Sequence, residues 1–190
     1  MKKLLAIFIF ITFFASCTFY DNSNSKTTAT SEDTSNSKTI VDCPADIAMR
    51  AFRFAELYKD SDTIYEWGGQ DPVRSAIAID CSGLVVMCYK YALVDTNYSL
   101  LLSDMTANYM YENAASIVPL EKIRQGDLIF MGEADSPKVT HIALFDCIEN
   151  NCVYFIDATE KDDISGVSRR VYKSSDSRFK AFGAMKVQYQ

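Results

Sequence analysis

The sequence predicts an α+β domain in which N-terminal helices pack on a mainly antiparallel sheet of about five to six strands. Apolar residues recur at helical spacing in the first half of the chain. Short runs rich in Val, Ile, Phe and Tyr, separated by turn residues, follow in the second half. Hydrophobic residues make up 48% of the chain and charged residues 23%, which is typical of a folded globular protein.

Three segments are predicted to be helical. Residues 45–58 place apolar side chains on one face, and residues 81–92 form a longer apolar run that opens directly after Asp80. A third helix is expected over residues 103–115. The second of these is expected to be a buried helix that begins near Cys81.

Five strands are predicted in the second half, at residues 127–131, 141–147, 152–158, 167–172 and 181–187. The second and third strands are joined by a short turn that Cys147 and Cys152 flank. A disulfide between these two cysteines would clip the hairpin, and Cys43 with Cys88 is a second candidate pair.

Residues 1–16 read as an export signal, with two lysines ahead of an apolar run that is too short to span a bilayer. The run ends at Phe14, Ala15, Ser16 and Cys17, which resembles a lipobox, although Leu is usual where Phe14 stands. We therefore expect Cys17 to be lipidated. The alternatives are a cleaved signal with an incidental cysteine and an uncleaved anchor.

The segment 17–40 is polar after its first residues and is expected to be a flexible tether, which leaves residues 41–190 as one folded domain. These features predict a lipoprotein anchored to a membrane of the cell envelope, facing the periplasm or the exterior. Cleavage before Cys17 would leave 17 basic and 25 acidic residues, a net charge of −8. An acidic domain is a poor nucleic-acid binder.

Cys81, His141 and Asp157 are the candidate catalytic residues. A thiol at a helix N-terminus beside a histidine is activated as a nucleophile, and His141 is the sole histidine of the chain. A hairpin between the strands that carry His141 and Asp157 would let the carboxylate orient the imidazole. The structural alternatives are a core cysteine, a structural histidine and a solvated aspartate at a strand end.

Other chemistries have weaker support. One histidine among scattered carboxylates gives no zinc-site spacing, and no Gly-rich phosphate loop is present. A serine mechanism would compete for the same histidine. We therefore expect neither a metal nor a cofactor.

Several short motifs occur together in a fixed order: Tyr65 and Trp67-Gly68-Gly69, then Asp80 to Leu84, then Gly126 to Phe130, then His141 before an apolar strand. Together they resemble the NlpC-type family of bacterial cell-wall cysteine peptidases over about residues 47–172.

The resemblance implies a papain-like fold and hydrolysis of peptidoglycan stem peptides, typically between γ-D-glutamate and a diamino acid, through an acyl-enzyme on Cys81. It also implies that Tyr65, Asp80 and Ser82 line the substrate cleft. The third catalytic position, which is commonly His, Asn or Gln, is Asp157 here, and the segment between Gly69 and Asp80 is longer than usual. Two alternatives stay open: a thiol hydrolase with another amide, ester or lipid substrate, and a non-catalytic wall-binding lipoprotein.

Overall fold

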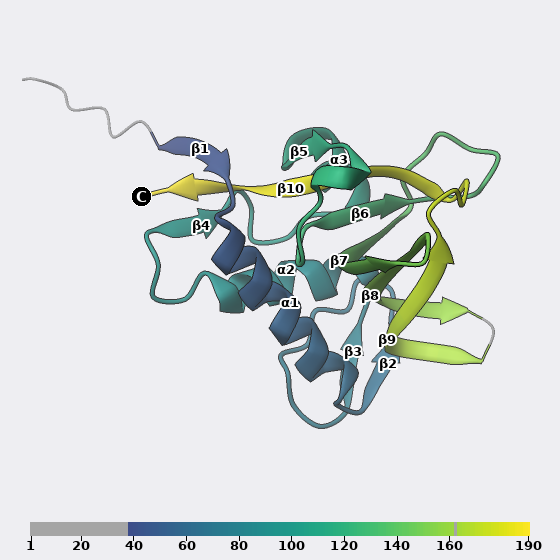
Figure 1. The fold of residues 1–190 in the computed structure, drawn as a ribbon. Helices are drawn as coiled ribbons and strands as arrows, with labels where there is room; N and C mark the ends of the chain where they lie inside the picture. The colour runs from purple at the N-terminus through teal and green to yellow at the C-terminus, as the bar shows by residue number, and fades with distance from the viewer. Residues whose placement is uncertain (1–37, 162) are drawn as a thin grey trace, which may run out of the picture. The chain divides into compact units, whose positions relative to one another are not determined.

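A large antiparallel sheet and two helices across it form the frame that carries the site (Figure 1). The computed structural model describes residues 38–161 and 163–190. The predicted export signal, the predicted lipidation site Cys17 and the predicted tether through residue 37 lie outside the described residues. No helix among the described residues is both long and apolar enough to cross a membrane.

The helices are α1 (Ala45–Lys59), α2 (Cys81–Ala92) and α3 (Ala107–Asn113), with a short 3-10 turn at Leu120–Lys122. The strands are β1 (Thr39–Asp42), β2 (Thr63–Tyr65), β3 (Ile77–Ile79), β4 (Tyr98–Leu100), β5 (Ala115–Val118), β6 (Leu128–Met131), β7 (His141–Glu149), β8 (Cys152–Lys161), β9 (Ile164–Lys173) and β10 (Phe179–Tyr189).

The main sheet has eight strands in the order β1-β10-β6-β7-β8-β9, with β4 and β5 also paired to β10, and every pairing is antiparallel. A separate parallel ribbon joins β2 to β3. The predicted fold class, with helices packed on a mainly antiparallel sheet, is therefore confirmed. The predicted count of five to six strands is wrong, because β1, β4 and β5 extend the sheet along the long strand β10.

Side chains alternate between the two faces of the sheet and build two cores. Leu128 and Phe130 of β6 face the large core under α1 and α2, whereas Ile129 and Met131 face a smaller cluster on the opposite side. Both faces of β6 are therefore buried, which explains its continuous apolar sequence. The same large core contains Cys81 and so fixes the start of α2.

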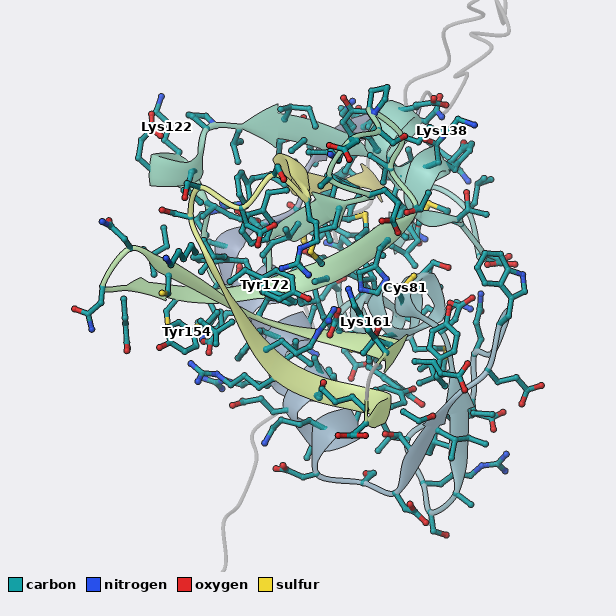
Figure 2. All side chains as sticks on the ribbon, turned by 90° about the vertical axis from the view of Figure 1, so that its right-hand side faces the viewer. Cys81, Lys122, Lys138, Tyr154, Lys161 and Tyr172 are labelled. Atoms are coloured by element: carbon teal, nitrogen blue, oxygen red, sulfur yellow. The ribbon has the colours of Figure 1, made fainter. Side chains whose placement is uncertain are left out.

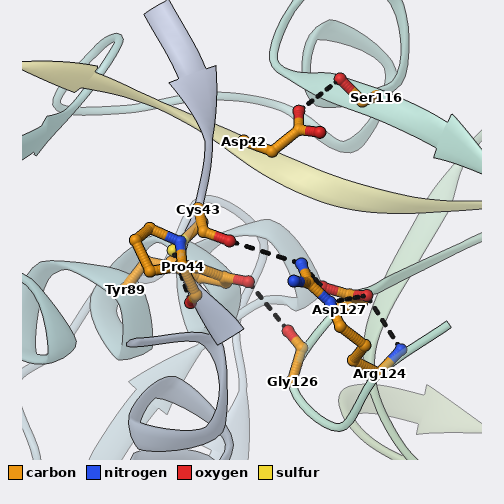
Figure 3. Close-up of polar contacts among 8 residues, drawn as sticks. All are labelled: Asp42, Cys43, Pro44, Tyr89, Ser116, Arg124, Gly126 and Asp127. Carbon is orange, nitrogen blue, oxygen red and sulfur yellow. Dashed lines mark hydrogen bonds and ion pairs between the residues drawn. The ribbon is translucent and has the colours of Figure 1, made fainter. Parts of the chain in front are cut away.

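Hydrogen bonds and close packing around Gly126 and Asp127 connect the start of β6 to the helices (Figure 3). The buried carboxylate of Asp127 accepts hydrogen bonds from the Arg124 side chain, and that guanidinium also donates to the carbonyl oxygen of Cys43. The Tyr89 hydroxyl of α2 donates to the carbonyl oxygen of Gly126 at 2.9 Å. A Cβ at Gly126 would lie 1.9 Å from a carbonyl oxygen of α1, so only glycine fits this approach.

One prediction about local structure is wrong, and neither candidate disulfide is formed among the described residues. The third helix is shorter than expected, because Thr106 caps it at the N-terminus and the chain turns into β5 after Ala114. All five described cysteines are free. In the β7–β8 hairpin Cys147 faces Tyr154 and Cys152 faces Glu149, so this register does not place the two cysteines opposite each other.

Candidate active site

Asp80 builds the start of α2 and the loop beside it. As the helix N-cap, its Oδ1 accepts a hydrogen bond from the backbone amide of Gly83 at 2.6 Å and another from the hydroxyl of Ser82 at 3.0 Å. Its Oδ2 accepts the amide of Gly68 at 2.8 Å. One buried carboxylate therefore fixes both the first turn of α2 and the loop that carries Trp67.

A close backbone contact locks the same loop against the helix. A Cβ at Gly83 would lie 2.0 Å from the carbonyl oxygen of Gly69, so a larger residue would push the loop away. Gln70 extends the contact by donating to Asp104 at 2.5 Å. The loop beside Cys81 is thus fixed by a close backbone contact and by one hydrogen bond between side chains.

Cys81 is the first residue of α2 and its side chain is 6% exposed. The peptide dipoles of the first helical turn stabilise negative charge at this position. Cys88, about two turns further along the same helix, is fully buried, and burial raises the pKa of its thiol well above the ordinary value. Cys81, in contrast, lines a pocket.

His141 opens β7, and its Nε2 lies 2.5 Å from Oδ2 of Asp157 on β8. Since Leu144 faces Ile156, the strand register places Asp157 beside Ala143, so the contact with His141 is diagonal. Asp157 is fully buried. With Nε2 engaged by the carboxylate, Nδ1 is the ring nitrogen available to Cys81.

The pKa of His141 is raised to about 9. Burial is the largest influence and lowers the pKa, but hydrogen bonds with Asp157 and Cys81 and the negative charges of both groups outweigh it. The site therefore favours an imidazolium between a carboxylate and a thiol. This is the charge arrangement that supports a thiolate nucleophile.

Tyr65 lies on the neighbouring β2–β3 ribbon. Its amide donates to the hydroxyl of Ser165 on β9, which fixes the ribbon to the sheet. Burial raises the pKa of its phenol to about 12, with the nearby charges of Cys81, Asp80 and Glu160 adding to the effect. The phenol is thus a protonated hydrogen-bond donor near neutral pH.

Two pockets flank the cysteine and histidine pair. A cavity of about 340 Å³ contains Cys81, Asp80 and Ser82, with Trp67 on its wall. A second cavity of about 290 Å³ contains His141, Tyr65 and Arg170. Figure 2 looks onto the face with Cys81, Lys161 and Tyr172 labelled, of which Lys161 and Tyr172 line the second cavity.

The structure thus brings every residue predicted for the site to one place: Cys81, His141, Asp157, Tyr65, Asp80 and Ser82. Sequence reasoning missed Arg170, which pairs with Asp157, and the pocket wall formed by Trp67. The Trp67 side chain is 84% exposed. Its place in the motif with Gly68 and Gly69 was a signal for the site, but its exposure could not be predicted.

Comparisons with known proteins bear on the fold and the family of the chain. The chain is similar in fold to a Staphylococcus aureus Mu50 structure described as similar to a lipoprotein of the NLP/P60 family, with 24% identity and a TM-score of 0.50, covering 80% of this chain and 44% of that one. It is similarly related to NlpC2 from Trichomonas vaginalis, with 19% identity and a TM-score of 0.50, covering 76% of this chain and 46% of that one.

The chain spans less than half the length of these two solved structures. A comparison with curated proteins gave no match. The model of the NlpC/P60 family, however, matches residues 62–181, which include Tyr65, Cys81, His141 and Asp157. The match covers most of the described domain and confirms the resemblance found in the sequence: the chain belongs to the NlpC/P60 family.

Proposed function

We propose that this protein is a cell-wall cysteine endopeptidase that hydrolyses an amide bond in peptidoglycan stem peptides, typically between γ-D-glutamate and a diamino acid. The observation that carries the proposal is the placement of Cys81 and His141 between two pockets, with Asp157 on the far side of the imidazole. Membership of the NlpC/P60 family suggests the cell wall as the source of the substrate.

In the first half-reaction the Cys81 thiolate attacks the carbonyl carbon of the substrate amide, and a C–S bond forms. The developing oxyanion is stabilised by backbone amides at the start of α2 and by the phenol of Tyr65, which stays protonated. The His141 imidazolium gives its proton to the leaving nitrogen as the C–N bond breaks. An acyl-enzyme and a free amine result.

In the second half-reaction neutral His141 takes a proton from water, and the hydroxide attacks the thioester carbonyl. The C–S bond breaks, the acid product leaves and the thiolate and imidazolium pair is restored. The net reaction consumes one amide and one water and yields one acid and one amine. Asp157 contributes by keeping the imidazole oriented toward Cys81 in both steps.

Tyr65, Asp80 and Ser82 are the proposed substrate-binding residues. Asp80 and Ser82 lie beside the thiol in one pocket, and Tyr65 lies in the other. Both oxygens of Asp80 already accept hydrogen bonds within the chain, so we assign Asp80 chiefly to shaping the pocket and adding negative charge for a substrate amine. Ser82 and Tyr65 supply hydroxyl groups for direct contact.

The predicted export signal and Cys17 extend the proposal to the location of the protein. A similar structure is described as similar to a lipoprotein, which supports a membrane-anchored place in the cell envelope. A lipid on Cys17 and a polar tether would hold the domain close to the peptidoglycan that it cuts.

The experiment is digestion of purified muropeptides of several stem types, followed by mass spectrometry. We expect the wild type to split one stem amide, Cys81→Ala and His141→Gln to lose cleavage, and Cys147→Ala to retain it as a thiol control outside both pockets. Absence of cleavage on every stem type would contradict the proposal. If a broad thiol probe still labelled Cys81, the result would favour a thiol hydrolase with another substrate. An unreactive Cys81 with measurable wall binding would favour a non-catalytic lipoprotein.

A further inference from the structure

The carboxylate of Asp157 has two partners, His141 and Arg170. Arg170 donates from Nε to Oδ1 at 2.8 Å and from Nη2 to Oδ2, so the guanidinium grips both oxygens. His141 contacts the same Oδ2. Asp157 is fully buried, so each of its charged contacts acts with little screening by water.

Arg170 is itself fixed in place. Its side chain is 11% exposed, and its Nη1 donates to the hydroxyl of Tyr172 at 2.7 Å. The guanidinium lies 5.3 Å from the ring centre of Phe155 and 5.4 Å from that of Tyr172, within the range of cation–π attraction. A guanidinium that is fixed in this way and bonds both carboxylate oxygens sets the orientation of the carboxylate and also balances its charge.

The pairing has an electrostatic consequence for the imidazole. A lone buried carboxylate beside His141 favours the imidazolium and raises the pKa of the ring. Arg170 Nη2 lies 3.5 Å from His141 Nε2 and places a positive charge against the imidazolium. Together, Asp157 and Arg170 carry no net charge, like the neutral residues that are common at this position in the family.

We propose that Arg170 is a positioning residue for the proposed hydrolysis: it holds Asp157 in one orientation and balances its charge, so that an aspartate can serve where a neutral side chain is usual. The inference rests on the proposed function for its activity readout, but its electrostatic part concerns the free protein.

Other charged and titratable groups also face His141. Cys81 approaches from α2, and the second cavity adds Tyr65, Glu133, Glu160, Lys161, Tyr172 and Arg178. Lys161, Glu133 and Glu160 are more exposed and better screened than the buried pair. Arg178 is already paired with Asp176 at 2.7 Å. Asp157 and Arg170 are the charged groups that contact Nε2 directly.

The test measures the pKa of His141 directly by NMR titration, which is simple because the chain has one histidine. Arg170→Met removes the balancing charge and should favour the imidazolium about tenfold more strongly, raising the pKa above that of the wild type. Asp157→Asn should lower the pKa below that of the wild type. The double variant should lie between the two single variants.

A matched control is available on the same strand. Arg169 also pairs with an aspartate, Asp146, at 2.6 Å, and lies over the ring of Tyr154. Arg169→Met should leave both the His141 pKa and muropeptide cleavage unchanged. If Arg170→Met does not fold, Arg170→Lys decides: the pKa should stay near the wild-type value while kcat falls, because one charge remains but the forked grip is lost.

Activity gives a second readout. Arg170→Met should lower kcat for muropeptides by about tenfold with little change in KM, and adding Asp157→Asn should recover part of the loss because no uncompensated charge remains. An arginine with a merely structural role would give additive losses instead.

The two proposals fail in different ways. An unchanged His141 pKa in Arg170→Met, or losses that simply add in the double variant, would overturn the role of Arg170 even if muropeptides are cleaved. The expected order of pKa values without any cleavage would support the charge balance and overturn the proposed peptidase function.

Discussion

Protonation of His141 should make the stability of the domain depend on pH in a specific way. The folded-state pKa of about 9 lies above the unfolded value of 6.5, so the folded state keeps its proton over a range in which the unfolded chain has lost it. The stabilising contribution is fully present below pH 6.5 and is lost as pH rises to about 9. At roughly 1.4 kcal/mol for each tenfold change in proton concentration, the loss is about 3 kcal/mol.

The assay is urea unfolding of the wild type and of His141→Gln at a series of pH values from 6 to 10. The free energy of unfolding of the wild type should fall by about 3 kcal/mol more than that of His141→Gln over this range. Glutamine removes the titrating ring but can still donate a hydrogen bond to Asp157. The difference between the two curves therefore measures the contribution of the bound proton to the free energy of unfolding. Parallel curves would refute the reasoning.

Three further predictions concern packing and the pocket wall. Gly83→Ala should destabilise the domain by about 1 to 3 kcal/mol and reduce cleavage, although alanine normally favours a helix, because the added Cβ would meet the carbonyl oxygen of Gly69. An unchanged free energy of unfolding in urea would contradict this. Trp67→Ala should change stability by less than about 0.5 kcal/mol but raise KM for muropeptides. The exposed control Leu57→Ala, outside the two cavities of the site, should change neither. Leu84→Ala in the fully buried core should cost about 2 to 5 kcal/mol in the same unfolding assay, and a smaller loss would show that the core around α2 is loosely packed.

Local patterns predicted the elements that carry the site. The helical period of residues 45–58 and the cap at Asp80 are properties of neighbouring residues, and α1 and α2 lie within one residue of their predicted bounds. β1, β4 and β5 were missed because each is three or four residues long and pairs only with β10, far away in the sequence. Such pairings depend on the assembled sheet rather than on a local pattern.

Strand register explains two further differences between the expected and the observed structure. The two-residue turn at Asn150 and Asn151 pairs Glu149 with Cys152, so Cys147 faces Tyr154 and the candidate bond between Cys147 and Cys152 is not formed. Arg170 was missed for a related reason. It faces Phe155 across the strands, and only its long side chain reaches Asp157 diagonally.

The most direct test of the central claim is the rate at which iodoacetamide alkylates each cysteine at pH 6, read by peptide mass spectrometry in the wild type and in His141→Gln. A thiolate paired with His141 should make Cys81 react far faster than the half-exposed Cys147 and Cys152, and the advantage should disappear in His141→Gln. Equal rates for Cys81 and Cys147, or a Cys81 rate that is the same in both proteins, would contradict the account.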